Sequence, residues 1–459
     1  MGGITMQKPV RALAVDLGAS HGRVIRGTYD GDRLTMETVC DFPNMPVIIN
    51  GTYYWDHVAL AANVLKGVEQ AGEAASVGVD AWGHDYIPVS ENGELIGQMF
   101  CYRDPRTTRI APYMAEHLPE LEAFLLTGEG VNAIATRAQL CALKKELPDT
   151  YAAARGILTV ADYVNYLLCG IRKVNETQVS MGGMMDLQTR GWCVPALEKL
   201  GLRTSWGDIA RCGEVLGKTP EGMAVVAVAA HDTASALSFL PQYRDDHLLL
   251  SSGTWALVGV KEEHPVMTEE TLRANLQAEL GAGEMLQINN LTGMWLMQEL
   301  ERQWGKIDYA QLNAEAAQSD YRETIDTQHG TLSLSGDMEN KIMQLLTDGG
   351  KQLPETHADY YRCILFSLIE KFKETIAVLE RIYHKKYTAI HIVGGGAKNT
   401  YFNQLIANET GKTVIAGPYE ATAIGNILEQ LCALGVIKSR AEAAAVLERS
   451  FPPEIYEPA

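Results

Sequence analysis

The sequence predicts an α/β protein built from two domains of similar design, and three observations carry this prediction. An apolar run at residues 12–15 ends at Asp16 and passes directly into a glycine-containing turn, as a buried strand followed by a loop does. A second apolar run at 248–250 passes into another turn of small residues. Between them, the segment 240–246, with Pro241 and two aspartates, interrupts the pattern. We therefore expect one domain at residues 1–240 and a second at 241–459.

Strands and helices alternate along the first of these domains. Short apolar runs rich in β-branched residues predict strands at 11–15, 23–29, 34–40, 76–79 and 225–229. Leu60, Val64 and Val68 recur at intervals of four and predict an amphipathic helix over 59–71. The region from 110 to about 168 is expected to be mostly helical.

The second domain repeats the order of strand, turn and strand. Apolar runs predict strands at 248–250, 255–260 and 389–393. A long amphipathic pattern predicts a helix over 360–383, and another helix is expected to begin near Thr400. This arrangement is typical of two α/β halves that share a plan without an obvious sequence repeat.

Composition excludes several classes of function. The chain has 459 residues and a net charge of −18, which argues against a nucleic-acid surface, because such a surface needs a basic patch. Its apolar runs fall short of the ~20 residues of a membrane span, and the N-terminus lacks the apolar core of a signal peptide. The eight cysteines follow no pairing pattern, so we expect buried, reduced thiols. The sequence predicts a cytoplasmic protein with neither a membrane nor a nucleic-acid partner.

The segment from Asp16 to Arg23, D-L-G-A-S-H-G-R, has the chemistry of a phosphate loop. Gly18 and Gly22 are expected to let the backbone turn tightly, and the N–H groups of such a turn converge on an anion. An aspartate at a strand end can hold Mg²⁺ directly or through water. Read alone, this segment is equally an ordinary glycine-rich hairpin.

Two later turns repeat this chemistry. Residues 251–254, S-S-G-T, follow the strand expected at 248–250, and residues 394–396 are three consecutive glycines after the strand expected at 389–393. Glycines at such a point allow another molecule to lie very close to the backbone. Together the three turns indicate a nucleotide held between two similar domains.

A strand end at His231-Asp232-Thr233 supplies the candidate acid/base group. Phosphoryl transfer to a hydroxyl needs a carboxylate that orients the hydroxyl and accepts its proton. Asp232 fits this role, although an aspartate here can equally cap a helix that begins at Thr233. The segment Trp82-Gly83-His84-Asp85 also follows a strand and has the aromatic and polar groups of a polyol site; the alternative is a turn around a packed tryptophan.

The chain resembles the FGGY carbohydrate kinases of the actin/Hsp70-like ATPase superfamily over almost its whole length. The motifs that carry this resemblance are V-D-L-G-A-S-H-G-R-V at 15–24, S-V-G-V-D-A-W-G-H-D-Y at 76–86, A-H-D-T-A-S-A at 230–236, L-S-S-G-T-W at 250–255, H-I-V-G-G-G-A-K-N at 391–399 and A-G-P-Y-E-A-T-A-I-G-N at 416–426. It implies two ribonuclease H-like ATPase domains with an interdomain active-site cleft. It also implies ATP- and Mg²⁺-dependent phosphorylation of a small ketose, with the C1 hydroxyl of L-rhamnulose as the first expectation. L-fuculose and xylulose are the alternatives within this class, and a non-catalytic sugar sensor that binds ATP is the alternative outside it.

The resemblance also implies roles for individual residues. It identifies Asp232 as the catalytic base and Asp16 as part of the Mg²⁺–nucleotide site. The residues implied to bind ATP are Ala19, Ser20, His21, Gly22, Arg23, Thr254, Gln298 and Gly396. The residues implied to bind the ketose are Gly83, His231, Asp232, Thr233 and Asn290.

Four positions depart from the family pattern. His21 stands in the first phosphate loop where a small residue is usual, and Ala81 stands where threonine or serine is usual. His84 replaces a valine, and Thr292 replaces an apolar residue. The last three flank the expected sugar pocket, so the sequence leaves the identity of the ketose open, as it does the oligomeric state.

Overall fold

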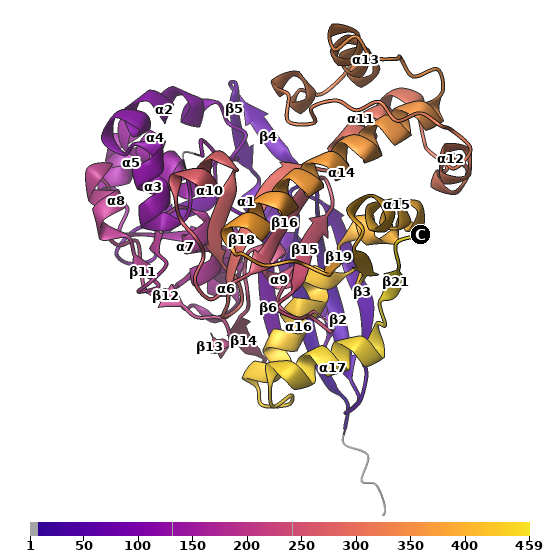
Figure 1. Ribbon diagram of the computed structural model, residues 1–459. Coiled ribbons are helices and arrows are strands. Elements are labelled where there is room, and N and C mark those ends of the chain that lie inside the picture. The colour runs from indigo at the N-terminus through magenta and orange to yellow at the C-terminus, as the bar shows by residue number, and fades with distance from the viewer. Residues whose placement is uncertain (1–7, 131, 241) are drawn as a thin grey trace, which may run out of the picture.

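The computed structural model describes residues 8–130, 132–240 and 242–459 and contains two large β-sheets, one in each half of the chain (Figure 1). In spatial order the first sheet consists of β13 (Glu214–Lys218), β14 (Ala224–Ala227), β6 (Ser76–Ala81), β1 (Val10–Leu17), β2 (His21–Tyr29) and β3 (Leu34–Pro43). The second consists of β17 (Leu276–Leu280), β18 (Met285–Thr292), β16 (Trp255–Lys261), β15 (His247–Ser252), β19 (Ala389–Val393), β20 (Thr413–Ala416) and β21 (Glu454–Tyr456).

The two sheets share a plan. In the first, β1 pairs antiparallel with β2 and parallel with β6, and β6 pairs parallel with β14. In the second, β15 pairs antiparallel with β16 and parallel with β19, which pairs parallel with β20. The prediction of two α/β halves is therefore confirmed. The domain boundary between residues 240 and 241 stays a prediction, and Pro241 of the expected linker lies outside the described residues.

Helices and small two-stranded sheets surround the first large sheet. The helices are α1 (His57–Ala71), α2 (Arg106–His117), α3 (Glu120–Thr127), α4 (Thr136–Glu146), α5 (Pro148–Ala153), α6 (Val160–Cys169), α7 (Glu176–Met181), α8 (Val194–Lys199) and α9 (Asp232–Ala236). The small sheets pair β4 (Pro46–Ile49) with β5 (Thr52–Trp55), β7 (Tyr86–Val89) with β8 (Gly156–Thr159), β9 (Val174–Asn175) with β12 (Ile209–Ala210), and β10 (Met185–Asp186) with β11 (Gly191–Trp192). The predicted helix over 59–71 begins two residues early, because the Asp56 side chain accepts from the Ala59 N–H and caps it.

The second half carries the longest helix. Its helices are α10 (Glu269–Arg273), α11 (Trp295–Trp304), α12 (Tyr309–Ala316), α13 (Met338–Asp348), α14 (His357–Ile382), α15 (Thr400–Thr410), α16 (Ala421–Ala433) and α17 (Arg440–Ser450), with short 3₁₀ turns η1 (Gly330–Ser333) and η2 (Gly395–Lys398). The helix predicted over 360–383 is α14, which starts earlier because Thr356 and Asp359 form a reciprocal capping box. No helix in the described ranges is long and apolar enough to cross a bilayer.

The last two helices pack mainly against the first sheet, although Ala421 at the start of α16 joins an apolar cluster with strands of the second. Figure 1 shows α16 and α17, in yellow, lying against the indigo strands β1–β3. Ile424, Ile427 and Leu431 of α16 share one apolar cluster with Ala12 and Ile25 of those strands. The C-terminal segment therefore completes the core of the N-terminal half.

Candidate active site

Acidic side chains gather where β1, β6 and α9 meet. Asp16 near the end of β1 is in register with Asp80 of β6, and both are buried. Burial raises the pKa of Asp16, as does the charge of Asp232, while the charge of Arg23 opposes this. Burial also raises the pKa of Asp80, followed by the charge of Asp16. The charges of Asp16 and Asp232 therefore disfavour ionisation of the buried Asp80.

The fit of Mg²⁺ to these residues is partial. Within the described ranges, no three carboxylate, histidine or cysteine groups lie close enough together to form a complete metal site. Arg23 donates to Asp16 Oδ2 at 2.5 Å, and Asp80 Oδ1 is buried without a hydrogen-bond partner. Asp16 therefore suits an ion that takes most of its ligands from phosphate and water, as Mg²⁺ does.

The first expected phosphate loop is shorter in the structure than in the sequence prediction. Residues 18–20 lie between β1 and β2, whereas His21, Gly22 and Arg23 already belong to β2. The expectation that Gly22 turns the chain is wrong: it pairs with Leu17, and a Cβ there would overlap with the Phe42 ring. Packing against β3 thus explains this glycine. Ala19 and Ser20 lie in the turn itself, and contact of residues 19–23 with the phosphates of ATP stays a prediction.

Arg23 links the two halves of the chain. Besides Asp16, its guanidinium donates to Glu420 at 2.7 Å, and Glu420 immediately precedes α16. The Arg23 side chain is about one-third exposed, at 31%, so this bridge lies near the surface.

The candidate base lies at the first residue of α9. Asp232 has a half-exposed side chain, and its Oδ1 accepts from the N–H of the next residue, Thr233, at 2.6 Å. The N-cap position belongs to His231, and no side chain caps this helix. The Asp232 carboxylate nevertheless accepts from an N–H of the first turn, so its role as a base stays a prediction.

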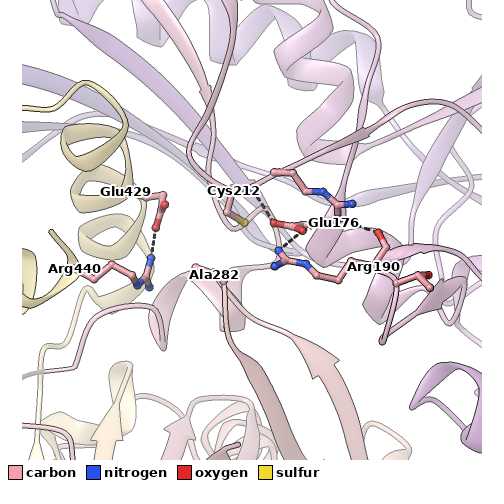
Figure 2. Close-up of a pocket in the computed structure, with 9 residues that line it drawn as sticks. Glu176, Arg190, Cys212, Ala282, Glu429 and Arg440 are labelled. Carbon is pink, nitrogen blue, oxygen red and sulfur yellow. Dashed lines mark hydrogen bonds and ion pairs between the residues drawn. The ribbon is translucent and has the colours of Figure 1, made fainter. Parts of the chain in front are cut away.

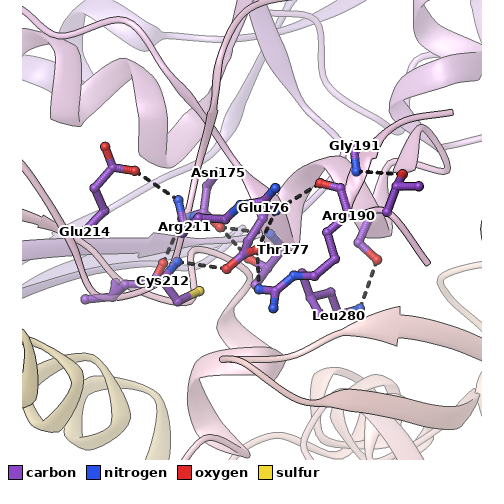
Figure 3. A network of polar contacts seen from close by, with 12 residues as sticks. Asn175, Glu176, Thr177, Arg190, Gly191, Arg211, Cys212, Glu214 and Leu280 are labelled. Atoms are coloured by element: carbon purple, nitrogen blue, oxygen red, sulfur yellow. Dashed lines mark hydrogen bonds and ion pairs between the residues drawn. The ribbon is translucent and has the colours of Figure 1, made fainter. Parts of the chain in front are cut away.

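The backbone of this element is held by the start of α7, whose polar contacts around Glu176 are drawn in Figure 3. The His231 N–H donates to Thr177 Oγ1 at 3.1 Å, and Asn175 caps α7 by accepting from the Thr177 N–H at 3.0 Å. The buried Glu176 is bound by Arg190 and Arg211. These contacts fix the strand end from which Asp232 projects.

The expected polyol segment is a tightly packed turn. Asp85 accepts from the indole N–H groups of Trp55 at 2.5 Å and Trp82 at 2.9 Å, and burial raises its pKa to about 6. Gly83 leaves no room for a Cβ, which would overlap with Met181. Trp82 is nearly fully buried, so the turn around a packed tryptophan is the arrangement that the structure contains.

His84 is the unusual member of this turn. It has a positive φ of 76°, and its Nδ1 is buried without a partner. Burial, with a smaller contribution from the charge of His231, lowers the pKa of His84 to about 3, so the ring is neutral. That it reads the sugar stays a prediction, as do the contacts of Gly83, His231 and Thr233 with the ketose.

Three residues expected to bind ATP lie together in the second half. Gln298 Nε2 donates to Thr254 Oγ1 at 3.1 Å. A Cβ on Gly396 would overlap with Ser252 Oγ, so η2 packs directly against the turn that carries Thr254. Ser252 is therefore the group that lies very close to the backbone at Gly396. A Cβ on Gly395 would instead meet open space. Gly395 is therefore the glycine of this turn that presents bare backbone outward.

Asn290 stands apart from this group. It is exposed on β18, in register with Leu257, and its carbonyl accepts from Asn275 Nδ2 at 3.2 Å. Its expected role at the sugar remains a prediction.

A cavity of about 460 Å³ lies elsewhere between the halves (Figure 2). Glu176, Arg190 and Arg211 line one side, and Glu429 and Arg440 line the other. Within this cavity the acidic and basic side chains pair with one another. Burial and the charges of the two glutamates raise the pKa of the Cys212 thiol there well above its usual value. The predicted site residues do not line it.

Sequence reasoning missed four residues at the site. Asp80 and Glu279 are each the only acidic residue of a largely apolar strand. Because burying a charge is costly, this pattern indicates a functional or structural role for the acid. Glu420 and Asn426 come from the far end of the chain, and nothing in their local sequence indicates contact with the first sheet.

Comparisons with known proteins agree with this architecture. The model of the FGGY carbohydrate kinase N-terminal domain matches residues 12–237, and that of the C-terminal domain matches 248–434. Rhamnulokinase of Bacteroides thetaiotaomicron is 32% identical over 97% of this chain and 95% of its own length, and that of Oceanobacillus iheyensis is 32% identical over 96% of both chains.

Solved structures of sugar and glycerol kinases share the fold. A ligand-bound xylulose kinase from Lactobacillus acidophilus superposes with a TM-score of 0.80 at 15% identity, covering 98% of this chain and 94% of that one. Plasmodium falciparum glycerol kinase with ADP gives 0.78 at 12% identity, with the same coverage. The predicted fold class is confirmed.

Proposed function

This chain belongs to the FGGY family of carbohydrate kinases, and we propose that it transfers the terminal phosphate of ATP to the C1 hydroxyl of a small ketose, L-rhamnulose. The half-exposed carboxylate of Asp232, at the start of α9, is the observation that carries this proposal for the site. Its charge acts on the buried Asp16 and raises the pKa of that residue. The choice of ketose is supported by full-length relatives named rhamnulokinase.

In this proposal Asp232 is the catalytic base. Its carboxylate accepts the proton of the sugar hydroxyl as the oxygen attacks the terminal phosphorus atom, a contribution typically worth roughly 10²–10⁴-fold in rate. Phosphoryl transfer needs little covalent help from the protein, so orientation of the hydroxyl is the main task. His231 and Thr233 flank the base and would hold neighbouring hydroxyls of the ketose.

The nucleotide would lie between the two short turns. Backbone N–H groups of residues 18–20 and the hydroxyl of Thr254, positioned by Gln298, would donate to phosphate oxygens. The bare backbone at Gly395 leaves room for the nucleoside. Mg²⁺ bound with ATP would offset the charge of the phosphates, with Asp16 as its protein ligand, directly or through water.

A panel of ketoses in a coupled assay of ADP release tests the proposal. We expect sugar-dependent ADP release that is fastest with L-rhamnulose, and phosphorus NMR of the product should place the phosphate on C1. A preference for L-fuculose or xylulose would overturn the choice of ketose. ADP release that no sugar accelerates would instead indicate an ATP-binding sensor.

A further inference from the structure

The ring of His231 lies between two carboxylates that come from different halves of the chain. Its Nε2 is 3.3 Å from Oδ1 of Asp232, and its Nδ1 is 3.3 Å from Oε1 of Glu279 on β17. His231 is 8% exposed and Glu279 is 7% exposed, so this contact lies in the interior. The result is a chain of three ionisable groups, Asp232–His231–Glu279, that crosses from the first half to the second.

Backbone contacts fix Glu279 in this place. The N–H of Leu280 donates to Ser180 Oγ on α7 at 2.9 Å, and the N–H of Ala278 donates to the Gly128 carbonyl at 2.9 Å. Glu279 is the residue between these two bonded positions. The helix that holds the His231 backbone, α7, therefore also holds the strand that carries Glu279 (Figure 3).

The charges around His231 favour its protonated form. The groups that face it are Asp232 on α9, Glu279 on β17, Glu129 after α3 and His84 after β6. Burial alone would lower the pKa of His231, but the charges of Glu279, then Asp232 and Glu129, outweigh burial and raise it. Burial raises the pKa of Glu129 to about 7, and the pKa of His84 is lowered to about 3. Among these groups Glu279 contributes most to raising the pKa of His231.

We propose that Glu279 is a positioning residue for phosphoryl transfer, which holds the His231 ring so that Nε2 faces Asp232 and fixes the carboxylate that receives the sugar proton. This inference rests on the proposed kinase activity. The Nδ1 and Oε1 atoms are in ionic contact but are not aligned as a hydrogen bond, so a small rotation of either side chain completes the link.

The Glu279→Gln variant tests this role, because it keeps the shape of the side chain and removes its charge. We expect kcat to fall by about tenfold, as for a misplaced base, with the KM for ATP unchanged. Loss of the charge lowers the pKa of His231, so the ring loses its proton at lower pH. The alkaline limb of the kcat profile should therefore move to lower pH by roughly one unit. The exposed Glu263 of the same half supplies the control, since Glu263→Gln should leave the profile unchanged.

Two further measurements separate positioning from folding. Ser180→Ala removes the docking bond and keeps the acid, so it should lower the melting temperature without moving the alkaline limb. In the wild-type protein, NMR of ¹³C-labelled histidine should give His231 a pKa above its ordinary value, whether or not the Glu279 variant folds. A neutral His231 ring at pH 6.5, or a Glu279→Gln variant with an unmoved limb, overturns the inference. If the wild type itself shows no sugar-dependent ADP release, the proposed function fails, while NMR of His231 in the wild type and in the Glu279→Gln variant still decides whether Glu279 holds the proton on His231.

Discussion

At the scale of single residues, Asp232 has the clearest expected outcome. Asp232→Asn keeps the size of the side chain but removes the proton acceptor, so we expect sugar-dependent ADP release to fall by roughly 10²–10⁴-fold. Binding of ATP should persist, because the nucleotide is expected to contact Thr254, Gln298 and the glycine turn η2. Steady-state kinetics and equilibrium binding of a fluorescent ATP analogue measure the two effects. Near wild-type turnover would remove Asp232 from the mechanism.

His84 should make the folded state sensitive to acid. Its pKa is about 3 in the folded protein and about 6.5 when exposed. Between these values the unfolded chain binds a proton that the folded protein does not, so the free energy of unfolding is highest above pH 6.5 and falls as the pH falls towards 3. Over this range the slope is at most about 1.4 kcal/mol per pH unit. Asparagine is a suitable replacement for His84, because it tolerates the positive φ at this position and does not take up a proton.

We therefore expect His84→Asn to flatten the dependence of melting temperature on pH between 6.5 and 4.5, measured by scanning calorimetry. His264→Asn is the matched control, because His264 is exposed. If the melting temperature depends on pH equally in the wild type and in the His84 variant, protonation of His84 does not destabilise the folded state, and this prediction is wrong.

At the scale of elements, the two neighbouring glycines of η2 should respond differently to the same change. Gly396→Ala places a methyl group against Ser252, including its Cβ and backbone oxygen, so we expect a loss of about 1–3 kcal/mol in stability. A methyl group on Gly395 meets open space, so Gly395→Ala should fold normally and raise the KM for ATP. Thermal melting and ATP titration distinguish the two variants. A destabilised Gly395 variant would contradict this division of roles.

Elements whose pattern is local could be predicted from the sequence. The strand predicted at 389–393 and the helix predicted to begin near Thr400 are found at those positions, because apolar runs and caps act within a few residues. The first phosphate loop was predicted too long, because Gly22 is needed for packing against Phe42. The sequence alone does not distinguish a glycine that is needed for a tight turn from one that is needed because a neighbouring ring packs against it.

At the scale of the whole molecule, contacts between distant segments could not be predicted. Asp80 is 346 residues from Asn426, whose Nδ2 donates to it at 2.6 Å. The buried face of α16 packs on a sheet that lies far away in the sequence, and local patterns do not indicate such a partner. Two of the three carboxylates of the cluster, Asp16 and Asp232, could therefore be identified from the sequence, whereas Asp80 could not.

The Asn426–Asp80 contact should link the stability of the two halves. Asn426→Ala leaves the buried Asp80 without its donor, which costs about 1–3 kcal/mol. Since α16 belongs to the second half and Asp80 to the first, we expect one calorimetric transition, shifted as a whole to lower temperature. Asn408→Ala, on the more exposed α15, serves as the control. Two separate transitions, of which only one shifts, would show that the halves unfold independently.

The position of α16 and α17 also has a consequence for biosynthesis. A ribosome delivers strands β1–β3 first and the helices that cover one of their faces last, some 400 residues later. Until then that face, with Ala12, Ala14 and Ile25, has no native cover. The nascent chain must be shielded from aggregation during most of its translation, so its yield should depend on chaperone capacity more than its final stability suggests.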